Sequence, residues 1–151
     1  MATFFNDLYD RFHELHADLI KTVDGLPPES LDWVAGKEMS SINILVVHLT
    51  GAERYLMGVV LDEPPERDRE SEFKVHGLSV DELKKLLTEA DEYLNQGLKR
   101  LSLQDLASVH LSPHSKKTVT ANWAILHALE HTATHLGHAQ LTRQLWEQRN
   151  A

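Results

Sequence analysis

The stretch Ala124–Leu141, AILHALEHTATHLGHAQL, decides the fold class of this chain. Its four histidines, His127, His131, His135 and His138, follow one another at intervals of four, four and three residues. Because an α-helix has about 3.6 residues per turn, this spacing places all four imidazoles on one helical face. Such a face can be a metal site, a pH-sensitive patch or a histidine-rich surface, and the stretch alone leaves all three interpretations open.

The rest of the chain shows the same helical periodicity in its apolar residues. Pro27-Pro28 and Pro64-Pro65 interrupt the pattern, and proline ends a helix. Ser79 with Glu82 three residues later is typical of a capping box at a helix start. No segment alternates apolar and polar residues as a half-buried strand does. The predicted helices span about residues 5–25, 40–61 and 79–101, and the last begins near Thr120 and carries Trp123, Leu126, Leu129 and Leu141.

Four amphipathic helices predict an all-α chain that forms a four-helix bundle, with residues 1–151 as a single domain. The connections are about 15 residues long, which allows either an up-down-up-down order or a crossover. The sequence does not decide between these two topologies.

Composition narrows the function. The 151 residues carry a formal net charge of −8, which argues against a general affinity for nucleic acid phosphates. The chain has no cysteine, so any metal must be held by nitrogen and oxygen ligands. Asp7 lies in an N-terminus without an apolar run, and no apolar stretch is long enough to span a membrane. We therefore expect a cytoplasmic protein without a signal peptide or a membrane segment.

A metal needs more than the His131–His135 pair, so a third ligand should come from another helix. The best candidate is His48 in ILVVHLTGAERYL, on the flank of an apolar stripe between Leu45 and Ala52. A zincin would need the order His-Glu-x-x-His, but the glutamate here precedes the pair. A carboxylate-bridged di-iron bundle would need Glu-x-x-His on two helices, which is missing as well. A mononuclear site with two or more histidines remains.

The segments SSINILVVHLTGAERYL and WAILHALEHTATHLGHAQLTR resemble the DinB/YfiT-like superfamily of metal-binding four-helix bundles, and the likeness covers nearly the whole chain. Its most specific part is one histidine on the second helix, a His-x-x-x-His pair on the last, and a glycine two residues later. Here these are His48, His131, His135 and Gly137. The resemblance implies a three-histidine site for one divalent ion, with coordination positions open to water or substrate.

That resemblance also implies a chemistry. Members of the superfamily include thiol-dependent S-transferases and isomerases that use low-molecular-weight thiols such as bacillithiol or mycothiol, and other members are linked by name to DNA-damage induction. We expect a metal-dependent enzyme, a thiol transferase or a hydrolase, that acts on a small molecule. The alternatives are a non-catalytic metal-binding or stress-response protein and a helical interaction module without metal. Three imidazoles favour zinc or nickel, with iron, copper or manganese as further choices.

Several other side chains have a predicted place near this site. His127 and His138 are expected to line its wall or to support the ligands. Glu130 could accept a hydrogen bond from a ligand imidazole, or its side chain could be exposed and form a salt bridge. Tyr55 either points its hydroxyl into the same cavity or packs in the core. His16 could approach the core from the first helix, whereas His13, His76, His110 and His114 are expected to be exposed to solvent.

The breadth of the apolar surface predicts a homodimer, as does the frequency of homodimers in the superfamily. The apolar residues outside the main stripes are Val47, Met57, Val59, Val60, Leu145 and Trp146. The competing explanation is that these residues pack under the charged loop between Asp62 and Gly77.

Overall fold

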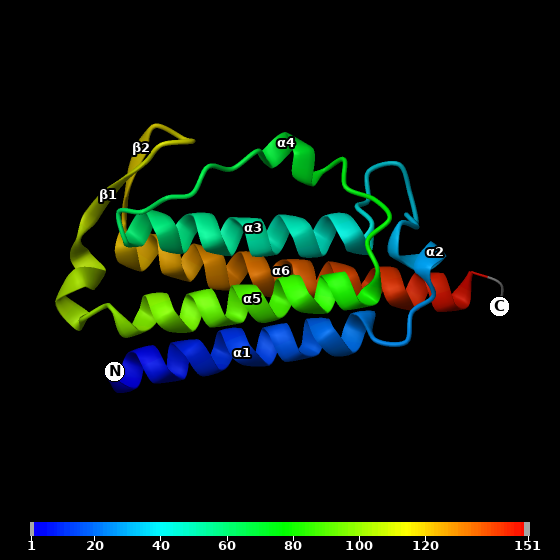
Figure 1. The fold of residues 1–151 in the computed structure, drawn as a ribbon, viewed down its shortest axis with the longest axis horizontal. Coiled ribbons are helices and arrows are strands. Elements are labelled where there is room, and N and C mark those ends of the chain that lie inside the picture. Colours follow the sequence, from blue (N-terminus) through cyan, green and yellow to red (C-terminus); the bar gives the residue numbers. More distant parts are fainter. Residues whose placement is uncertain (1, 150–151) are drawn as a thin grey trace.

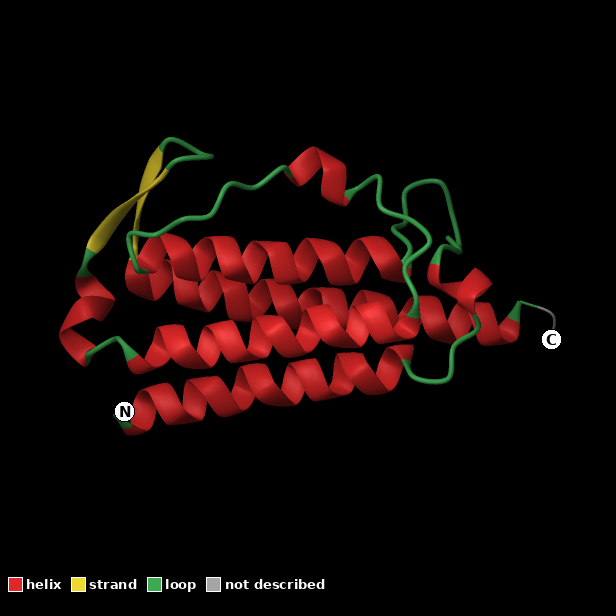
Figure 2. Cartoon of the chain, in the orientation of Figure 1, coloured by secondary structure: helices red, strands yellow, loops and turns green. Residues whose placement is uncertain are grey.

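The computed structural model describes residues 2–149 and confirms the all-α four-helix bundle (Figures 1 and 2). Each predicted helix is present, and its ends lie within a few residues of the expected positions. The four long helices are α1 (Thr3–Val23), α3 (Ile42–Val60), α5 (Val80–Lys99) and α6 (Ala121–Gln148).

Side-chain caps explain where three of these helices begin. The Ser41 side chain accepts a hydrogen bond from the backbone N–H of Ile44, and Thr120 does the same for Trp123. Ser79 and Glu82 form the predicted capping box at the start of α5. Each cap satisfies a backbone N–H that has no partner inside the helix, which fixes the first turn.

The connection between α3 and α5 is a crossover. Figure 1 shows residues 61–79 running back along the outside of α3, from one end of the bundle to the other, with the short helix α4 (Arg69–Glu72) about halfway. As a result α3 and α5 run in one direction, and α1 and α6 run in the other. Helix α3 packs on α5 and α6, and α1 packs on the same two helices from the opposite side. A short helix, α2 (Pro28–Leu31), lies between α1 and α3.

The prediction that the chain has no strand was wrong. After the 3₁₀ helix η1 (Leu103–Ala107), strands β1 (Val109–Ser112) and β2 (Lys117–Thr120) form an antiparallel hairpin. Strand β1 buries its polar residues and exposes its apolar ones, which is the reverse of the usual pattern. Alternation of buried apolar and exposed polar residues could therefore not reveal it.

The apolar face expected for α6 was also wrong. Trp123, Leu126 and Leu141 are 50%, 48% and 46% exposed. The helix instead turns mostly small residues toward its neighbours and leaves another face to the histidines. Its buried residues are Ala121, Ala124, Ile125, Ala128, Thr132, Leu136, Ala139, Thr142 and Trp146.

The apolar residues that suggested a dimer surface are largely buried inside this chain. Met57, Val59, Val60 and Trp146 are buried, and Trp146 packs edge-on against Trp33 with ring centroids 5.7 Å apart. The crossover covers the end of α3, as the competing explanation expected: a side chain at Gly58 would touch the backbone at Glu63.

Within residues 2–149, no helix combines the length and the apolar character that a membrane span requires.

Candidate metal centre

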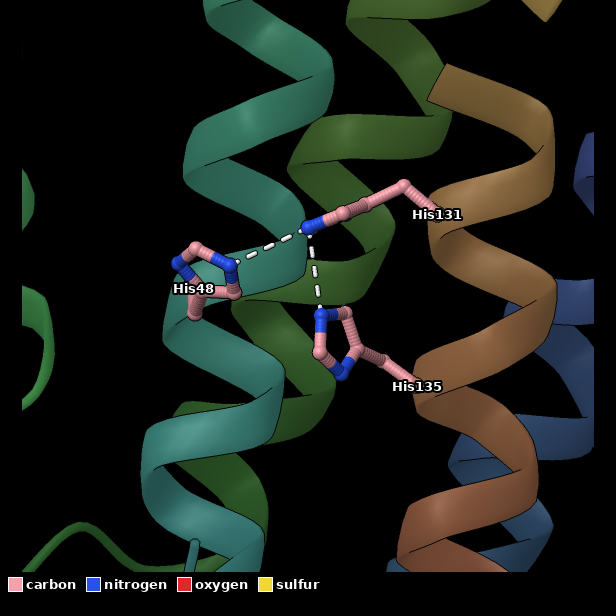
Figure 3. A group of neighbouring side chains, drawn as sticks. All are labelled: His48, His131 and His135. Carbon is pink, nitrogen blue, oxygen red and sulfur yellow. Dashed lines mark hydrogen bonds between the residues drawn. The ribbon is translucent and has the colours of Figure 1, made fainter. Parts of the chain in front are cut away.

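Three imidazoles from two helices converge on one point (Figure 3). Nε2 of His131 lies 3.1 Å from Nε2 of His48 and 3.1 Å from Nε2 of His135. Two nitrogens held by one ion at about 2.0–2.1 Å lie about 2.9–3.4 Å apart for bond angles between about 90° and 110°. The structure therefore brings the three predicted ligands together: two of the three nitrogen pairs have this spacing, and all three nitrogens lie within 4.8 Å of one another. Among the described residues this is the only such group of three.

Helix geometry places these side chains. His131 and His135 are four residues apart on α6, so their rings lie one above the other, with centroids 4.3 Å apart. His48 projects from the neighbouring helix α3 and is buried, as expected for a residue on the flank of an apolar stripe. The pair is thus set by local helix geometry, and the third nitrogen is set by the packing of α3 on α6.

Hydrogen bonds among the three rings cannot satisfy all three nitrogens. Nδ1 of His48 lies 2.8 Å from the Glu72 carboxylate, so a neutral His48 carries its proton there and a lone pair on Nε2. Nε2 of His131 can either donate one hydrogen bond or accept one, so it can form a hydrogen bond with only one of its two neighbours. The other 3.1 Å contact is therefore not a hydrogen bond. A cation accepts all three lone pairs at once, so these residues fit a divalent metal ion.

Burial keeps two of the imidazoles neutral. Burial, together with repulsion from the neighbouring histidines, lowers the pKa of His131 to about 3 and that of His135 to about 4. Coordination requires the neutral form of histidine. At neutral pH both side chains are therefore ready to bind a metal without first losing a proton.

The sequence did not identify the residues that hold His48 in place. Glu72 on α4 accepts the hydrogen bond from His48. Arg67 donates two hydrogen bonds to the same carboxylate, from Nε to Oε1 at 2.6 Å and from Nη2 to Oε2 at 2.8 Å. Burial would raise the pKa of Glu72, but the hydrogen bonds from His48 and Arg67 lower it instead. A carboxylate behind a ligand imidazole fixes the tautomer and the ring orientation. Both residues come from the charged crossover, where no local pattern singles them out.

Of the two predictions for Glu130, the structure contradicts the hydrogen bond to a ligand imidazole and shows the exposed ion pair. Its side chain is 79% exposed, and its ion-pair contact is Nδ1 of His127 at 3.9 Å rather than a ligand imidazole. On the helix, residue 130 is turned about 100° away from residue 131, which carries its carboxylate out of the site. Glu72 therefore has the supporting role that was one of the two possibilities for Glu130.

His127 and His138 flank the three rings on either side. His127 stacks on Trp123, with ring centroids 4.8 Å apart and an interplanar angle of 21°. His138 is exposed, with Nδ1 3.4 Å from Nδ1 of His135. His127 lines the pocket described below, in agreement with its predicted place on the wall.

A pocket of about 820 Å³ opens beside His48 and His131. Tyr55 lies in its wall, with the hydroxyl 3.1 Å from Oγ of Ser112 and 2.9 Å from the backbone N–H of His114, which donates to it. The two interpretations of Tyr55 are thus combined, because the side chain borders the pocket and also anchors the hairpin to α3. Strand β2 and the loop before it supply much of the rest of the wall.

A second polar cluster lies inside the bundle. The buried His16 of α1 has Nε2 3.0 Å from both carboxylate oxygens of Glu53 on α3, and Nδ1 3.1 Å from Asp91 on α5. Thr132 of α6, the residue after ligand His131, donates to Glu53 at 2.5 Å. Burial alone would lower the pKa of His16, but Asp91 and Glu53 outweigh it and raise the pKa to about 9. The approach of His16 to the core is confirmed, and its partner Glu53 lies on the apolar stripe of α3, a signal that the sequence offered.

The other histidines divide into two groups. His13, His76 and His114 are exposed, as expected. His110 was expected in solvent but is buried, with Nδ1 2.8 Å from Asp62 and Nε2 2.6 Å from Ser108. It lies on the inner face of β1, so the missed hairpin explains this error.

Comparison with known proteins adds the family. The sequence profile of the family described as mycothiol-S-transferase matches residues 7–148. No curated protein matches the chain in a sequence comparison. The fold is similar to that of Bacillus subtilis YfiT, described as "a probable metal-dependent hydrolase with an unusual four-helix bundle topology". The two share 15% identity with a TM-score of 0.79, over 97% of this chain and 90% of YfiT.

Two further solved structures share the fold. A DinB-like protein from Bacillus cereus aligns with a TM-score of 0.75 and 12% identity, over 93% of this chain and 91% of that chain. A mycothiol-dependent maleylpyruvate isomerase aligns with a TM-score of 0.70 and 14% identity, over 92% of this chain and 63% of the isomerase. With its profile match over residues 7–148 and this shared bundle, the chain belongs to the mycothiol-S-transferase family of the DinB/YfiT-like superfamily.

Proposed function

We propose that this protein is a metal-dependent transferase for a low-molecular-weight thiol, in which His48, His131 and His135 hold one divalent ion. The observation that carries the proposal is the convergence of three imidazole nitrogens, all within 4.8 Å of one another, at the edge of an open pocket. The family match and the likeness to a mycothiol-dependent isomerase support a thiol as the co-substrate. We expect zinc or nickel, although imidazole ligands suit copper and iron as well.

The chain's own residues prepare the site. Glu72 fixes the Nδ1 proton of His48 and thereby turns its Nε2 lone pair toward the other two ligands, while Arg67 holds Glu72 in place. A bound divalent ion supplies the positive charge that lowers the pKa of a thiol toward neutrality. His127 and His114 line the same pocket and are the imidazoles that can accept the proton of the incoming thiol.

Metal content tests the ligand set. The protein is purified without a nickel column and assayed by elemental analysis, and we expect one ion per chain. His135→Ala should lose most of this ion because two imidazoles remain, whereas His76→Ala, a change at an exposed histidine, should keep it. A full complement of metal in His135→Ala would refute the ligand set.

Turnover tests the reaction. The loaded protein is incubated with mycothiol, bacillithiol or cysteine and an electrophile such as monochlorobimane, and conjugate formation is followed by fluorescence. We expect a rate above that of the uncatalysed reaction for at least one thiol, and loss of that rate in His135→Ala. Metal binding without turnover of any pair would favour the non-catalytic alternative, in which the ion joins α3 to α6.

A further inference from the structure

The pocket beside the metal centre differs in charge from the chain as a whole. The chain has 23 Asp and Glu residues against 15 Lys and Arg residues. The wall of the pocket contains Arg67, Arg69 and Lys117, and the described residues that line it include neither aspartate nor glutamate. In an acidic protein a cationic cleft attracts anions, whereas the negatively charged remainder of the surface repels them.

Two of these cations are free to meet a ligand. Arg67 is committed to the carboxylate of Glu72 at 2.6 Å. Arg69 and Lys117 are exposed, and neither has an acidic partner among the residues that the structure describes. The Arg69 guanidinium lies over the Phe73 ring, 5.0 Å from its centroid, and this ring in turn lies 4.7 Å from the ring of His48. Arg69 is thus held close to a proposed metal ligand.

The pocket also offers an apolar surface. Trp123 is 50% exposed and stacks on His127, so the free side of the indole is available to a ligand. Leu56 and Val119 line the same wall. The exposed face of the Trp123 indole can bind the flat or apolar part of a small molecule. Because the indole already stacks on His127, it need not move when a ligand binds.

We infer that this pocket binds a small molecule that carries a carboxylate group together with an apolar portion, with Arg69 and Lys117 on the carboxylate and Trp123 on the apolar part. The inference rests on the proposed function, since it names the substrate class of the same site. Arg69 comes from the crossover and Lys117 from the hairpin, so two segments outside the four-helix bundle provide the selectivity. The anionic group can belong to the thiol or to the electrophile, and the chemistry of recognition is the same for both.

A thiol-free probe tests the inference apart from the metal. The protein is depleted of metal with a chelator, and the binding of benzylsuccinate and of its uncharged diamide is measured by titration calorimetry. We expect benzylsuccinate to bind at least about tenfold more tightly, which corresponds to about 1.4 kcal/mol. Raising the salt concentration should weaken the binding of the dicarboxylate and leave that of the diamide unchanged.

Matched substitutions locate the contacts. Lys117→Gln and Arg69→Gln should each weaken benzylsuccinate binding about tenfold, the effect of one lost charge-assisted hydrogen bond. The controls are Lys116→Gln, one residue away and outside the pocket wall, and Arg54→Gln on α3, and both should bind as the unchanged protein does. Equal affinity for the two probes, or an equal loss in Lys116→Gln and Lys117→Gln, would overturn the inference.

Turnover then separates the two sources of the anionic group. Mercaptosuccinate and its diamide are compared as thiols with an uncharged electrophile, and a charged and an uncharged electrophile are compared with an uncharged thiol. A KM that rises in Lys117→Gln only for the charged thiol assigns the carboxylate to the thiol. A KM that rises only for the charged electrophile assigns the carboxylate to the electrophile. Tight binding of benzylsuccinate without any transfer would refute the proposed function and support the inference. Transfer without preference for charged substrates would support the proposed function and refute the inference.

Discussion

Nδ1 of His48 lies 2.8 Å from Oε2 of Glu72, and this contact joins the crossover between α3 and α5 to the metal centre. Glu72 fits beside α3 because residue 51 is a glycine: a Cβ atom there would lie 2.6 Å from Oε1 of Glu72. The crossover is therefore more than a connection, because it supplies the carboxylate that orients one of the three imidazoles.

We expect Glu72→Ala to lower metal affinity about 10- to 100-fold, the usual effect of removing a carboxylate behind a ligand histidine. A competition titration with a chelator measures this, and circular dichroism confirms that the helices persist. Gly51→Ala, which leaves Glu72 in the sequence but pushes its carboxylate away, should weaken binding in the same direction. The control is Glu70→Ala, a change at an exposed residue of the same short helix. Unchanged affinity in Glu72→Ala would show that His48 needs no support.

The buried ion pair between His16 and Glu53 predicts a loss of stability at alkaline pH. The folded pKa of His16 is about 9, above its ordinary value of 6.5, so the contribution of this group is complete below pH 6.5 and is lost as the pH rises through 9. At about 1.4 kcal/mol per pKa unit this contribution is about 3 kcal/mol. Urea unfolding between pH 6 and pH 10 measures it.

A pair of variants isolates His16 from the other groups that titrate at high pH. His16→Gln leaves Glu53 buried without a charged partner, and we expect a loss of about 3–5 kcal/mol at pH 6 and a weaker dependence on alkaline pH. His13→Gln, one turn earlier on α1 and exposed, should change stability by less than about 0.5 kcal/mol. Equal effects of the two substitutions would contradict the assignment.

Two helical glycines should respond in opposite directions to alanine. A Cβ atom at Gly58 would lie 2.7 Å from Cδ of Pro65 and 2.9 Å from the carbonyl oxygen of Glu63, whereas one at Gly137 would meet nothing within 4 Å. We expect Gly58→Ala to destabilise the fold by about 1–3 kcal/mol, since the crossover backbone must move. Gly137→Ala should stabilise it by about 0.5–1 kcal/mol through helix propensity. The free energy of unfolding in urea decides both, and a stabilised Gly58→Ala would show that the crossover packs loosely.

The homodimer remains a prediction, now with a different expected surface. Burial of Met57, Val59, Val60 and Trp146 removes them as interface residues. The apolar side chains that stay exposed near the pocket end of the chain, apart from Trp123 in the pocket itself, are Val109 and Leu111 of the hairpin and Leu126 of α6. We expect light scattering at micromolar concentration to give twice the 17.2 kDa of one chain. A mass near 17.2 kDa would refute the dimer.

Local information in the sequence determined the helices. Periodicity, proline breaks and a capping box involve residues within a few positions of one another, so they predicted the four helices and the His131–His135 pair. The flank of the apolar stripe then suggested His48, which lies 83 residues from His131 along the chain, and the likeness to a known superfamily supported this choice. The hairpin was missed because β1 buries His110 and exposes Leu111, so its alternation carries no apolar signal.

Only the tertiary structure decided what surrounds the three histidines. Whether the connection after α3 turns back at once or runs the length of the bundle cannot be read from its length, yet this choice places Glu72 behind His48 and Arg69 beside the pocket. The same holds for α6, whose buried face consists mostly of small residues while Leu126 and Leu141 lie exposed. The physical reason is that helix formation depends on hydrogen bonds within one turn, whereas the site depends on side chains that meet only after the helices and the crossover have packed.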